Sequence, residues 1–309
     1  MPYNRLDYVA LASRAPEATA DFLGRQLGLE RRAVAAGKDG PKLVIFAVGQ
    51  TQVAVFPLGH PLIDGSDKPG VHHIALAADD LARARKEVES VGLMAESGEE
   101  TGLGSRRRFC LDPAFTAGIR TYLSEPLDLA SSSSAHVERI DHLGVASADN
   151  EGGLLAFRDR LGCPLESQQT DMEVSIAVES FTSDKYGAVY HTRAPELVGG
   201  LRSWFVTVGD CELELLQDFD PDAGGTVRHG TPGNTRQDRG AISRFVESRG
   251  AGLHHIAFKT PDINKLLPAL QRDGTDVIDH IGRPGSRRAM IGFVQPKSIG
   301  GVLVHFVER

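Results

Sequence analysis

The sequence contains one position, usually a histidine, that recurs in four similar short segments. The segments are Leu6-Asp7-Tyr8-Val9, Val71-His72-His73-Ile74, Ile140-Asp141-His142-Leu143 and Leu253-His254-His255-Ile256. The shared position holds Tyr8, His73, His142 and His255. Repeated segments predict repeated structural units, and imidazole is a common ligand of first-row metal ions. The second half of the chain has a histidine in both of its copies, so metal chemistry is expected there.

Two further repeats extend this set of positions. Gly104-Ser105-Arg106-Arg107 recurs as Gly285-Ser286-Arg287-Arg288, and each copy leads into a strand-like segment in which Tyr122 aligns with His305. Gly49 to Ala54 aligns with Gly209 to Glu214, which pairs Ala54 with Glu214. The four positions therefore hold Tyr8, Ala54, His73 and Tyr122 in the first half, and His142, Glu214, His255 and His305 in the second. Only the second set could bind a metal as a group, and His73, which lacks partner donors, is predicted to be structural.

The elements that must position these residues follow the same repeat. Each opening strand precedes a segment with amphipathic helical spacing, such as Glu17 to Leu29, and then alternating strands such as Lys42 to Val48. This pattern predicts an α+β protein built from four strand–helix–three-strand modules. The polar run 131–136 is the expected linker between two domains, 1–130 without a metal and 137–309 with the metal site.

Local signals refine this picture. Asp79 and Asp262 are expected to cap helices, and Pro268 is expected to kink or break the last helix. The third module carries two insertions, near 168–200 and 218–249, and long loops beside a site usually act as lids or substrate walls.

Strand alternation makes a prediction about the neighbours of the repeated position. His72 and His254 each precede it by one residue, so their side chains are expected on the opposite face of the strand, as packing groups or as partners of the ligands. A basic cluster lies near the last two strands, but its repeat in the first half indicates solvated loops rather than an anion site. The cluster comprises Arg283, Arg287, Arg288 and Lys297, and the repeat is Arg106 to Arg108.

Composition narrows the classes of function. The 309 residues are 41% hydrophobic with a formal net charge of -7, which argues against nucleic-acid partners because those require a basic field. No apolar run approaches the roughly 20 residues of a membrane span, and residues 1–14 lack a signal-peptide pattern. The three scattered cysteines indicate buried thiols in a reducing cytosol, so a cytoplasmic location is expected. The sequence leaves the oligomeric state open, a homodimer included.

With these four modules and their ligand positions, the chain resembles the vicinal oxygen chelate superfamily, which includes glyoxalases, bleomycin resistance proteins and extradiol dioxygenases. The resemblance implies two incomplete barrels, each made of two βαβββ modules, and one divalent metal. The fourth module looks most like methylmalonyl-CoA epimerase, through Gly252 to Phe258 and Gln295 to Val304. Where that family ends its last strand with a glutamate ligand, this chain has His305. Where the family keeps a catalytic glutamate, it has Val198, and Glu196 lies two residues earlier.

Together these observations predict one metal ion on His142, Glu214, His255 and His305, with Glu196 as the first candidate for the catalytic base. Mixed nitrogen and oxygen donors suit Zn, Fe(II), Mn, Co or Ni. The first hypothesis is an isomerase or lyase, glyoxalase-like or epimerase-like, that chelates a small substrate through adjacent oxygens and stabilises an enolate-type intermediate. The alternative is a non-haem Fe(II) extradiol or keto-acid dioxygenase, and the third is a non-catalytic small-molecule binding protein.

Overall fold

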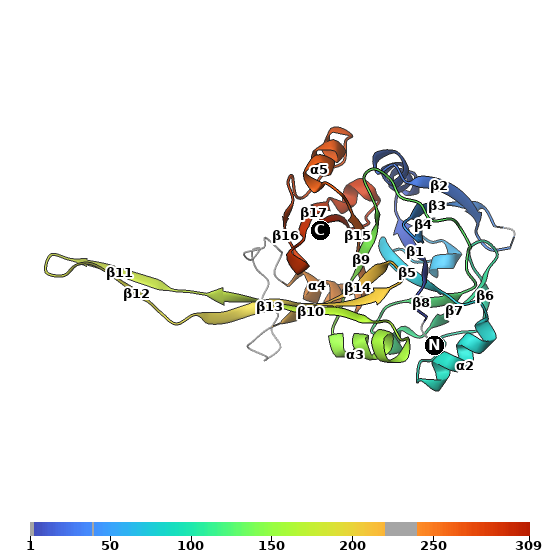
Figure 1. Cartoon of the computed structure of the whole chain (residues 1–309), viewed down its shortest axis with the longest axis horizontal. Helices are drawn as coiled ribbons and strands as arrows, with labels where there is room; N and C mark the ends of the chain where they lie inside the picture. Colours follow the sequence, from blue (N-terminus) through green and yellow to red (C-terminus); the bar gives the residue numbers. More distant parts are fainter. Residues whose placement is uncertain (1–2, 39, 220–239) are drawn as a thin grey trace.

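Two curled eight-stranded sheets of the same design form the body of the protein (Figure 1). The computed structural model describes residues 3–38, 40–219 and 240–309. The strand order is β2-β3-β4-β1-β5-β8-β7-β6 in the first sheet and β10-β13-β14-β9-β15-β18-β17-β16 in the second. The two orders match position by position, so the expected α+β architecture of paired βαβββ modules is confirmed.

The strand bounds are as follows. The first sheet contains β1 (Leu6–Ser13), β2 (Glu30–Ala35), β3 (Lys42–Val48), β4 (Thr51–Pro57), β5 (Gly70–Ala77), β6 (Glu100–Thr101), β7 (Arg107–Leu111) and β8 (Thr121–Ser124). The second contains β9 (Arg139–Ala146), β10 (Leu165–Ser175), β13 (Glu196–Val208), β14 (Cys211–Phe219), β15 (Gly252–Lys259), β16 (Arg283–Pro284), β17 (Met290–Val294) and β18 (Val304–Glu308). A separate two-stranded ribbon is made of β11 (Val178–Ser183) and β12 (Gly187–Thr192).

Short helices cover the outside of the sheets. They are α1 (Pro16–Asp21), α2 (Leu81–Ser90), α3 (Asn150–Leu154), α4 (Ala241–Arg249) and α5 (Ile263–Arg272), and π-helical turns continue α1 through Gln26 and α3 through Arg160. Asp262 caps α5 as predicted, but Asp80 rather than Asp79 caps α2, because its carboxylate accepts the N–H of Arg83 at 2.9 Å. Of the kink or break predicted at Pro268, the break does not occur. The helix α5 continues through that residue, and its buried leucines pack it onto the sheet.

The two halves share one hydrophobic core. It lies on the helix side of both sheets and includes Val9 and Ile74 from the first half with Leu143 and Ile256 from the second. Polar contacts also join the halves, such as the hydroxyl of Thr19 donating to a backbone oxygen of the second half at 3.2 Å. The division into domains 1–130 and 137–309 remains our proposal. No helix within the described ranges is both long and apolar enough to cross a bilayer.

The insertion expected at 168–200 is not an irregular loop but a long antiparallel ribbon that leaves the body (Figure 1). The strands β10 and β13 pair from Leu165 opposite Val206 out to Ser175 opposite Glu196, and β11 and β12 continue the ribbon to its tip. Of the second insertion, residues 220–239 lie outside the described residues, and α4 follows them at Ala241–Arg249.

Candidate metal centre

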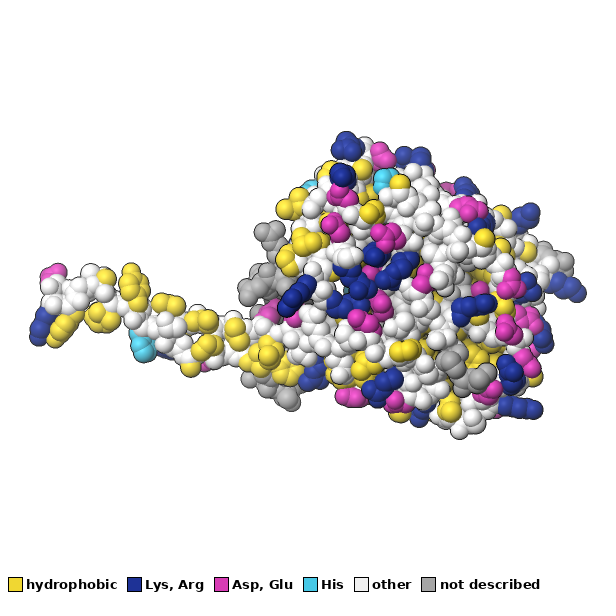
Figure 2. Space-filling view, viewed as in Figure 1, with side chains coloured by type: hydrophobic (Ala, Val, Ile, Leu, Met, Phe, Trp, Pro, Cys, Tyr) yellow, Lys and Arg dark blue, Asp and Glu magenta, His cyan; other side chains and the backbone are white. Residues whose placement is uncertain are grey.

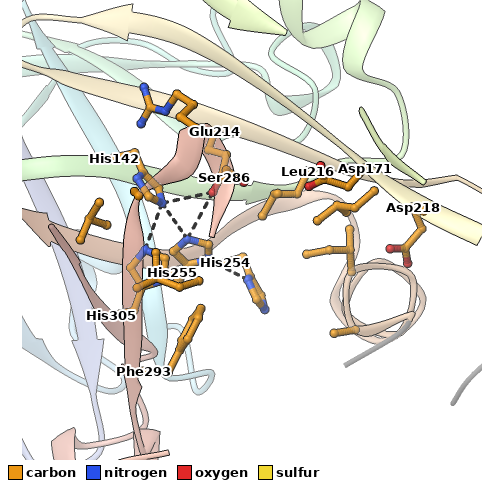
Figure 3. Close-up of a pocket in the computed structure, with 18 of the residues that line it drawn as sticks. His142, Asp171, Glu214, Leu216, Asp218, His254, His255, Ser286, Phe293 and His305 are labelled. Atoms are coloured by element: carbon orange, nitrogen blue, oxygen red, sulfur yellow. Dashed lines mark hydrogen bonds and ion pairs between the residues drawn. The ribbon is translucent and has the colours of Figure 1, made fainter. Parts of the chain in front are cut away.

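Four side chains from four neighbouring strands of the second sheet face one another on its concave side (Figure 3). Nε2 of His142 on β9 lies 3.3 Å from Nε2 of His255 on β15 and 3.1 Å from Nε2 of His305 on β18. Oε2 of Glu214 on β14 lies 3.1 Å from Nε2 of His142 and 3.7 Å from that of His255. All four residues are at least 95% buried, so the donors face a space screened from water.

The strand register explains why these residues meet. His142 lies opposite Ala257 of β15, which in turn lies opposite His305, whereas His255 and Glu214 both lie opposite Gly144 of β9. A glycine is needed at position 144, because a Cβ on Gly144 would overlap the imidazole of His255. The absence of a side chain at this one residue gives the His255 ring its place.

The spacing of the donor atoms fits a single first-row metal ion. Ligand atoms bound about 2.0–2.2 Å from one ion lie roughly 2.8–3.6 Å apart when they occupy neighbouring positions. The four distances given above, 3.1 to 3.7 Å, fall within about 0.1 Å of that range. The ligand atoms of the three histidines all lie within 4.8 Å of one another, and Glu214 approaches two of them, His142 and His255. Without a cation or proton between them, facing imidazole lone pairs would repel one another. The donor set therefore fits the group that the sequence predicts.

Hydrogen bonds at the far side of two rings leave their Nε2 atoms free to act as ligands. Oδ1 of Asp141 lies 2.9 Å from Nδ1 of His142, so this nitrogen carries the proton. Nδ1 of His255 lies 3.0 Å from Nδ1 of His254 and can donate to it. Such partners fix the tautomer and orientation of a ligating histidine. Nδ1 of His305 is buried and has no hydrogen-bond partner within the described part of the chain.

The electrostatics of the group favour a bound cation. Burial alone would lower the pKa of His142, but the Glu214 and Asp141 carboxylates overcome this effect and raise it to about 9. Burial and the neighbouring imidazoles hold the pKa of His255 well below its usual range, and burial does the same for His305. The group thus accommodates one positive charge next to Glu214, and a metal ion would replace the proton on His142.

The prediction that His254 points away from the site is wrong. His254 and His255 both line the same cavity, and Figure 3 shows the two rings side by side. The register between β9 and β15 shifts between Leu253 and His255, and such an irregularity breaks the two-residue alternation of side chains. Burial lowers the pKa of His254 to about 4. It is therefore neutral near pH 7 and can accept the proton of His255.

A cavity of about 790 Å³ opens in front of the four donors. Its wall is mainly apolar, with residues such as Phe205, Leu216 and Phe293. Three carboxylate residues, Asp171, Glu173 and Asp218, also line it.

Glu196, the predicted catalytic base, does not line this cavity. It is exposed on the ribbon, opposite Ser175, four residues beyond the last β13 residue that reaches the cavity. The structure therefore does not bring Glu196 to the donors.

The basic cluster is only partly solvated, contrary to expectation. The side chain of Arg287 is 11% exposed, and its guanidinium lies 3.2 Å from Asp141 and 3.4 Å from Glu212. It also lies over the ring of Phe205. Arg287 therefore holds the carboxylate that orients His142, which the repeat in sequence could not reveal. Lys297 is exposed, as expected.

In the first half, a side chain of the protein itself occupies the corresponding place. The same register brings Tyr8, Ala54, His73 and Tyr122 together. Arg108 lies among them, 1% exposed, with Nη1 2.9 Å from the hydroxyl of Tyr8 and 3.1 Å from Nε2 of His73, and its guanidinium lies over the ring of Tyr122. The structural role predicted for His73 agrees with this position, whereas the prediction of a solvated loop is wrong for Arg108.

Comparison with known proteins agrees with this architecture. Residues 5–115 match the model of the Glyoxalase/Bleomycin resistance protein/Dioxygenase superfamily. The uncharacterized protein YqjC of Bacillus subtilis is 24% identical over 56% of this chain and 93% of its own length. Human mitochondrial methylmalonyl-CoA epimerase is 24% identical over 60% of this chain and 82% of its own.

Two solved structures share the fold over the whole chain. A mutant of 4-hydroxymandelate synthase from Streptomyces coelicolor aligns with all of this chain and 93% of its own, at a TM-score of 0.64 and 14% identity. The Mn(II)-bound glyoxalase from Novosphingobium aromaticivorans covers 99% of this chain and 82% of its own, at a TM-score of 0.55 and 16% identity.

Proposed function

We propose that this chain, whose residues 5–115 match the Glyoxalase/Bleomycin resistance protein/Dioxygenase superfamily, has a metal-dependent isomerase or lyase activity on a small substrate that presents two adjacent oxygens. One divalent ion is held by His142, Glu214, His255 and His305. The observation that carries the proposal is the convergence of these four buried donors in front of an apolar cavity. Relatives that include methylmalonyl-CoA epimerases support the same class of reaction.

The metal ion, when bound, polarises a substrate carbonyl and stabilises the negative charge that develops when a neighbouring proton is removed. The protein supplies the surroundings. Because Nδ1 of His254 accepts from His255, its Nε2 carries a proton and can donate a hydrogen bond to a ligand in the cavity. The apolar wall excludes water, which strengthens both interactions.

Proton transfer requires a base, and the acids of the cavity wall are better placed for it than Glu196. Asp218 is held by the N–H and hydroxyl of Ser243, and Asp171 accepts from the amide of Gln169 at 2.8 Å. Arg283 also lies on the wall near Phe293, where its guanidinium is paired with the carboxylate of Asp279 at 3.0 Å. The mainly apolar wall suits a carbonyl compound with an apolar part.

The donor set also supports a second candidate. His142, His255 and Glu214 include the two-histidine, one-carboxylate combination that non-haem Fe(II) oxygenases use. With iron, the same cavity would suit an extradiol or keto-acid dioxygenase. The fourth donor, His305, distinguishes the two proposals, because it reduces the number of open positions on the ion.

The first test is metal content and affinity after anaerobic purification and reconstitution. We expect about one ion per chain in the wild type and in Glu212→Gln, and at least roughly tenfold weaker binding in Glu214→Gln. The control is closely matched, since Glu212 lies two residues away on β14 and pairs with Arg287 and Arg309 instead. No binding by the wild type, or equal binding by both variants, would overturn the proposed centre.

The second test is activity of the loaded protein. Exchange of the α-proton with D2O, followed by NMR for a panel of 2-oxo acids and acyl-CoA thioesters, should depend on the metal and not on oxygen. Oxygen uptake with Fe(II) and a catechol or aromatic 2-oxo acid would instead support the dioxygenase. Tight ligand binding that is unchanged in His142→Ala/His255→Ala, without either reaction, would leave a binding protein.

A further inference from the structure

The second sheet curls until its two edges come close together beside the cavity. One edge is β10, which runs on into the arm that projects from the body (Figure 2), and the other is the hairpin of β16 and β17, residues 283–294. Residues of both edges line the cavity, with Asp171 and Met172 on β10 and Arg283 and Ala289 on the hairpin. We call the gap between these two edges the seam.

The equivalent seam of the first half is closed by the main chain. There the N–H of Gly104 donates to the carbonyl of Ala35 at 2.9 Å, and the N–H of Gly37 donates to the carbonyl of Gly102 at 3.1 Å. In the second half, where both edges lie within the described residues, no main-chain hydrogen bond joins β10 to the hairpin. The hydrogen bonds across the second seam involve side chains, so this seam is held less firmly than the first.

Arg287 makes the contacts that close the second seam. It belongs to the turn Ser286–Ala289 of the hairpin. Its N–H donates to Oε1 of Gln169 on β10 at 2.8 Å, and its Nη1 lies 3.0 Å from Oε2 of Glu166 on the same strand. The guanidinium also lies over the ring of Phe205 on β13. One residue therefore joins the hairpin to the opposite edge of the sheet.

The same guanidinium contacts the carboxylate behind the metal centre. Nη2 of Arg287 lies 3.2 Å from Oδ1 of Asp141, which is the oxygen that faces Nδ1 of His142 at 2.9 Å. The other oxygen of Asp141 accepts from Arg309 at 3.0 Å. The two arginines thus hold the buried carboxylate from two sides, and Arg287 connects the oxygen that orients His142 to the seam.

The backbone of Arg287 has a conformation that residues other than glycine rarely adopt, with a φ of 55°. The turn 286–289 matches the turn 103–106 of the first half, because in both the N–H of the fourth residue donates to the carbonyl of the first. The second residue of the turn is Arg287 in one half and Gly104 in the other. Strained residues persist where surrounding contacts hold them, and they concentrate at functional sites. The contacts of the Arg287 side chain therefore hold a turn that a glycine would form without strain.

We propose that Arg287 is a positioning residue that couples the seam to the metal centre, and the inference rests on that proposed centre. With the seam closed, Arg287 holds Asp141 so that the ring of His142 presents its Nε2 to the ion. With the hairpin displaced, the guanidinium leaves Asp141 and the ring loses its orientation. Coupling between two sites is reciprocal, so a bound ion holds the hairpin against β10.

The coupling also affects the wall of the cavity. Because both edges of the seam line the cavity, an ion on the four donors fixes the wall that a substrate contacts. The metal-free protein holds the same wall less firmly. Binding of the ion and completion of the cavity are therefore one event.

Binding of Co(II), followed by its visible absorption, tests the positioning. We expect Arg287→Gln to bind Co(II) about 10- to 100-fold more weakly than the wild type and with an altered spectrum, because the carboxylate that orients His142 is less constrained. The matched control is Arg288→Gln, which removes the same charge from the next, exposed residue of the turn and should bind as the wild type does. Equal affinities and spectra in the two variants would overturn the inference and leave the metal centre standing. A wild type that binds no Co(II) would overturn both.

Chemical rescue separates the guanidinium from the fold of the turn. Arg287→Gly gives the turn the residue that the first half has at this position, so the variant should fold as the wild type does. Millimolar methylguanidinium should restore most of its lost Co(II) affinity, and methylammonium should not, because the planar guanidinium matches the geometry of a carboxylate. Equal rescue by the two cations, or wild-type affinity without either, would contradict the role of Arg287.

Hydrogen exchange tests the reciprocal effect. In the wild type and in Arg288→Gln, saturating Co(II) should slow exchange of the main-chain amides of residues 285–289 at least about tenfold. In Arg287→Gln, saturation with Co(II) should leave these amides unchanged, and residues 102–106 of the first half provide an internal reference in each protein. Slowing in Arg287→Gln equal to that of the wild type would overturn the coupling, as would a Co(II)-bound wild type without slowing.

Discussion

Nη1 of Arg108 lies 3.1 Å from Nε2 of His73. In the second half, the equivalent nitrogen belongs to His255 and faces the other metal-ligand candidates. His73 is also oriented like His255, because its Nδ1 lies 2.8 Å from Nδ1 of His72. The first half thus keeps the oriented histidine, but the guanidinium of Arg108 supplies the positive charge there.

Replacing Arg108 should destabilise the protein strongly. Arg108→Met would leave the buried Tyr8 hydroxyl and His73 without their partner, and losing one member of a buried polar group costs on the order of 3 kcal/mol. Urea unfolding monitored by circular dichroism measures the loss. The control is Arg107→Met, an exposed member of a surface ion pair, which should cost about 1 kcal/mol or less. Equal costs for the two variants would contradict a central role for Arg108.

His254→Ala should weaken metal binding by about 10- to 100-fold, because it removes the group that accepts the proton of His255 and fixes its tautomer. Competition with a chromophoric chelator measures the affinity. The matched control is His72→Ala, which removes the same neighbour from the half that contains Arg108. Unchanged affinity in His254→Ala would show that the bond between the two rings has no part in binding.

Gly144→Ala should displace the imidazole of His255 and weaken metal binding at least about tenfold, with little loss of fold stability. The first half shows that the backbone accepts a side chain here, since Ala10 occupies the equivalent position opposite His73. Calorimetric metal titration and thermal unfolding separate the two effects. A variant with wild-type affinity would show that the ring can move aside at no cost.

The carboxyl of Asp7 should make stability depend on pH. Burial raises its pKa to about 6, although the N–H of Leu127 opposes the shift. Because the folded pKa exceeds the unfolded value near 4, the stabilisation is complete below about pH 4 and is lost as pH rises through about 6. Relative to Asp7→Asn, the wild type should therefore lose up to about 3 kcal/mol between pH 4 and 7. Urea unfolding of both proteins across this range measures the difference between their free energies of unfolding. A difference that does not change with pH would contradict the raised pKa of Asp7.

Much of the candidate centre could be predicted from the repeats. Repeated strands keep one register, so residues at one repeated position, such as His142 and His255, must approach each other on the same face. The ribbon was harder to predict, because apolar residues such as Val174 and Val178 alternate in an exposed arm as they would in a half-buried strand. Glu196, placed near the site by its distance along the sequence, lies on that arm instead.

Other features depend on details that a repeat in sequence does not specify. The direction of His254 follows from a local register shift between two strands that are far apart in the chain. The burial of Arg108 depends on a long side chain that reaches across the sheet from β7 to Tyr8. Residue type and spacing alone could not indicate the direction of His254 or the burial of Arg108.

Arg108 also limits the evolutionary routes open to the first half. A positive charge that belongs to the polypeptide cannot be stripped by a chelator or exchanged when the supply of a metal changes. Placing a metal there would require losing Arg108 and also replacing Ala54 and both tyrosines. Each of these steps taken alone gives no complete donor set and leaves buried polar groups unpaired or a cavity. The two halves of one fold therefore stabilise the same place by different means, the first with a guanidinium of the chain itself and the second with four metal-ligand candidates.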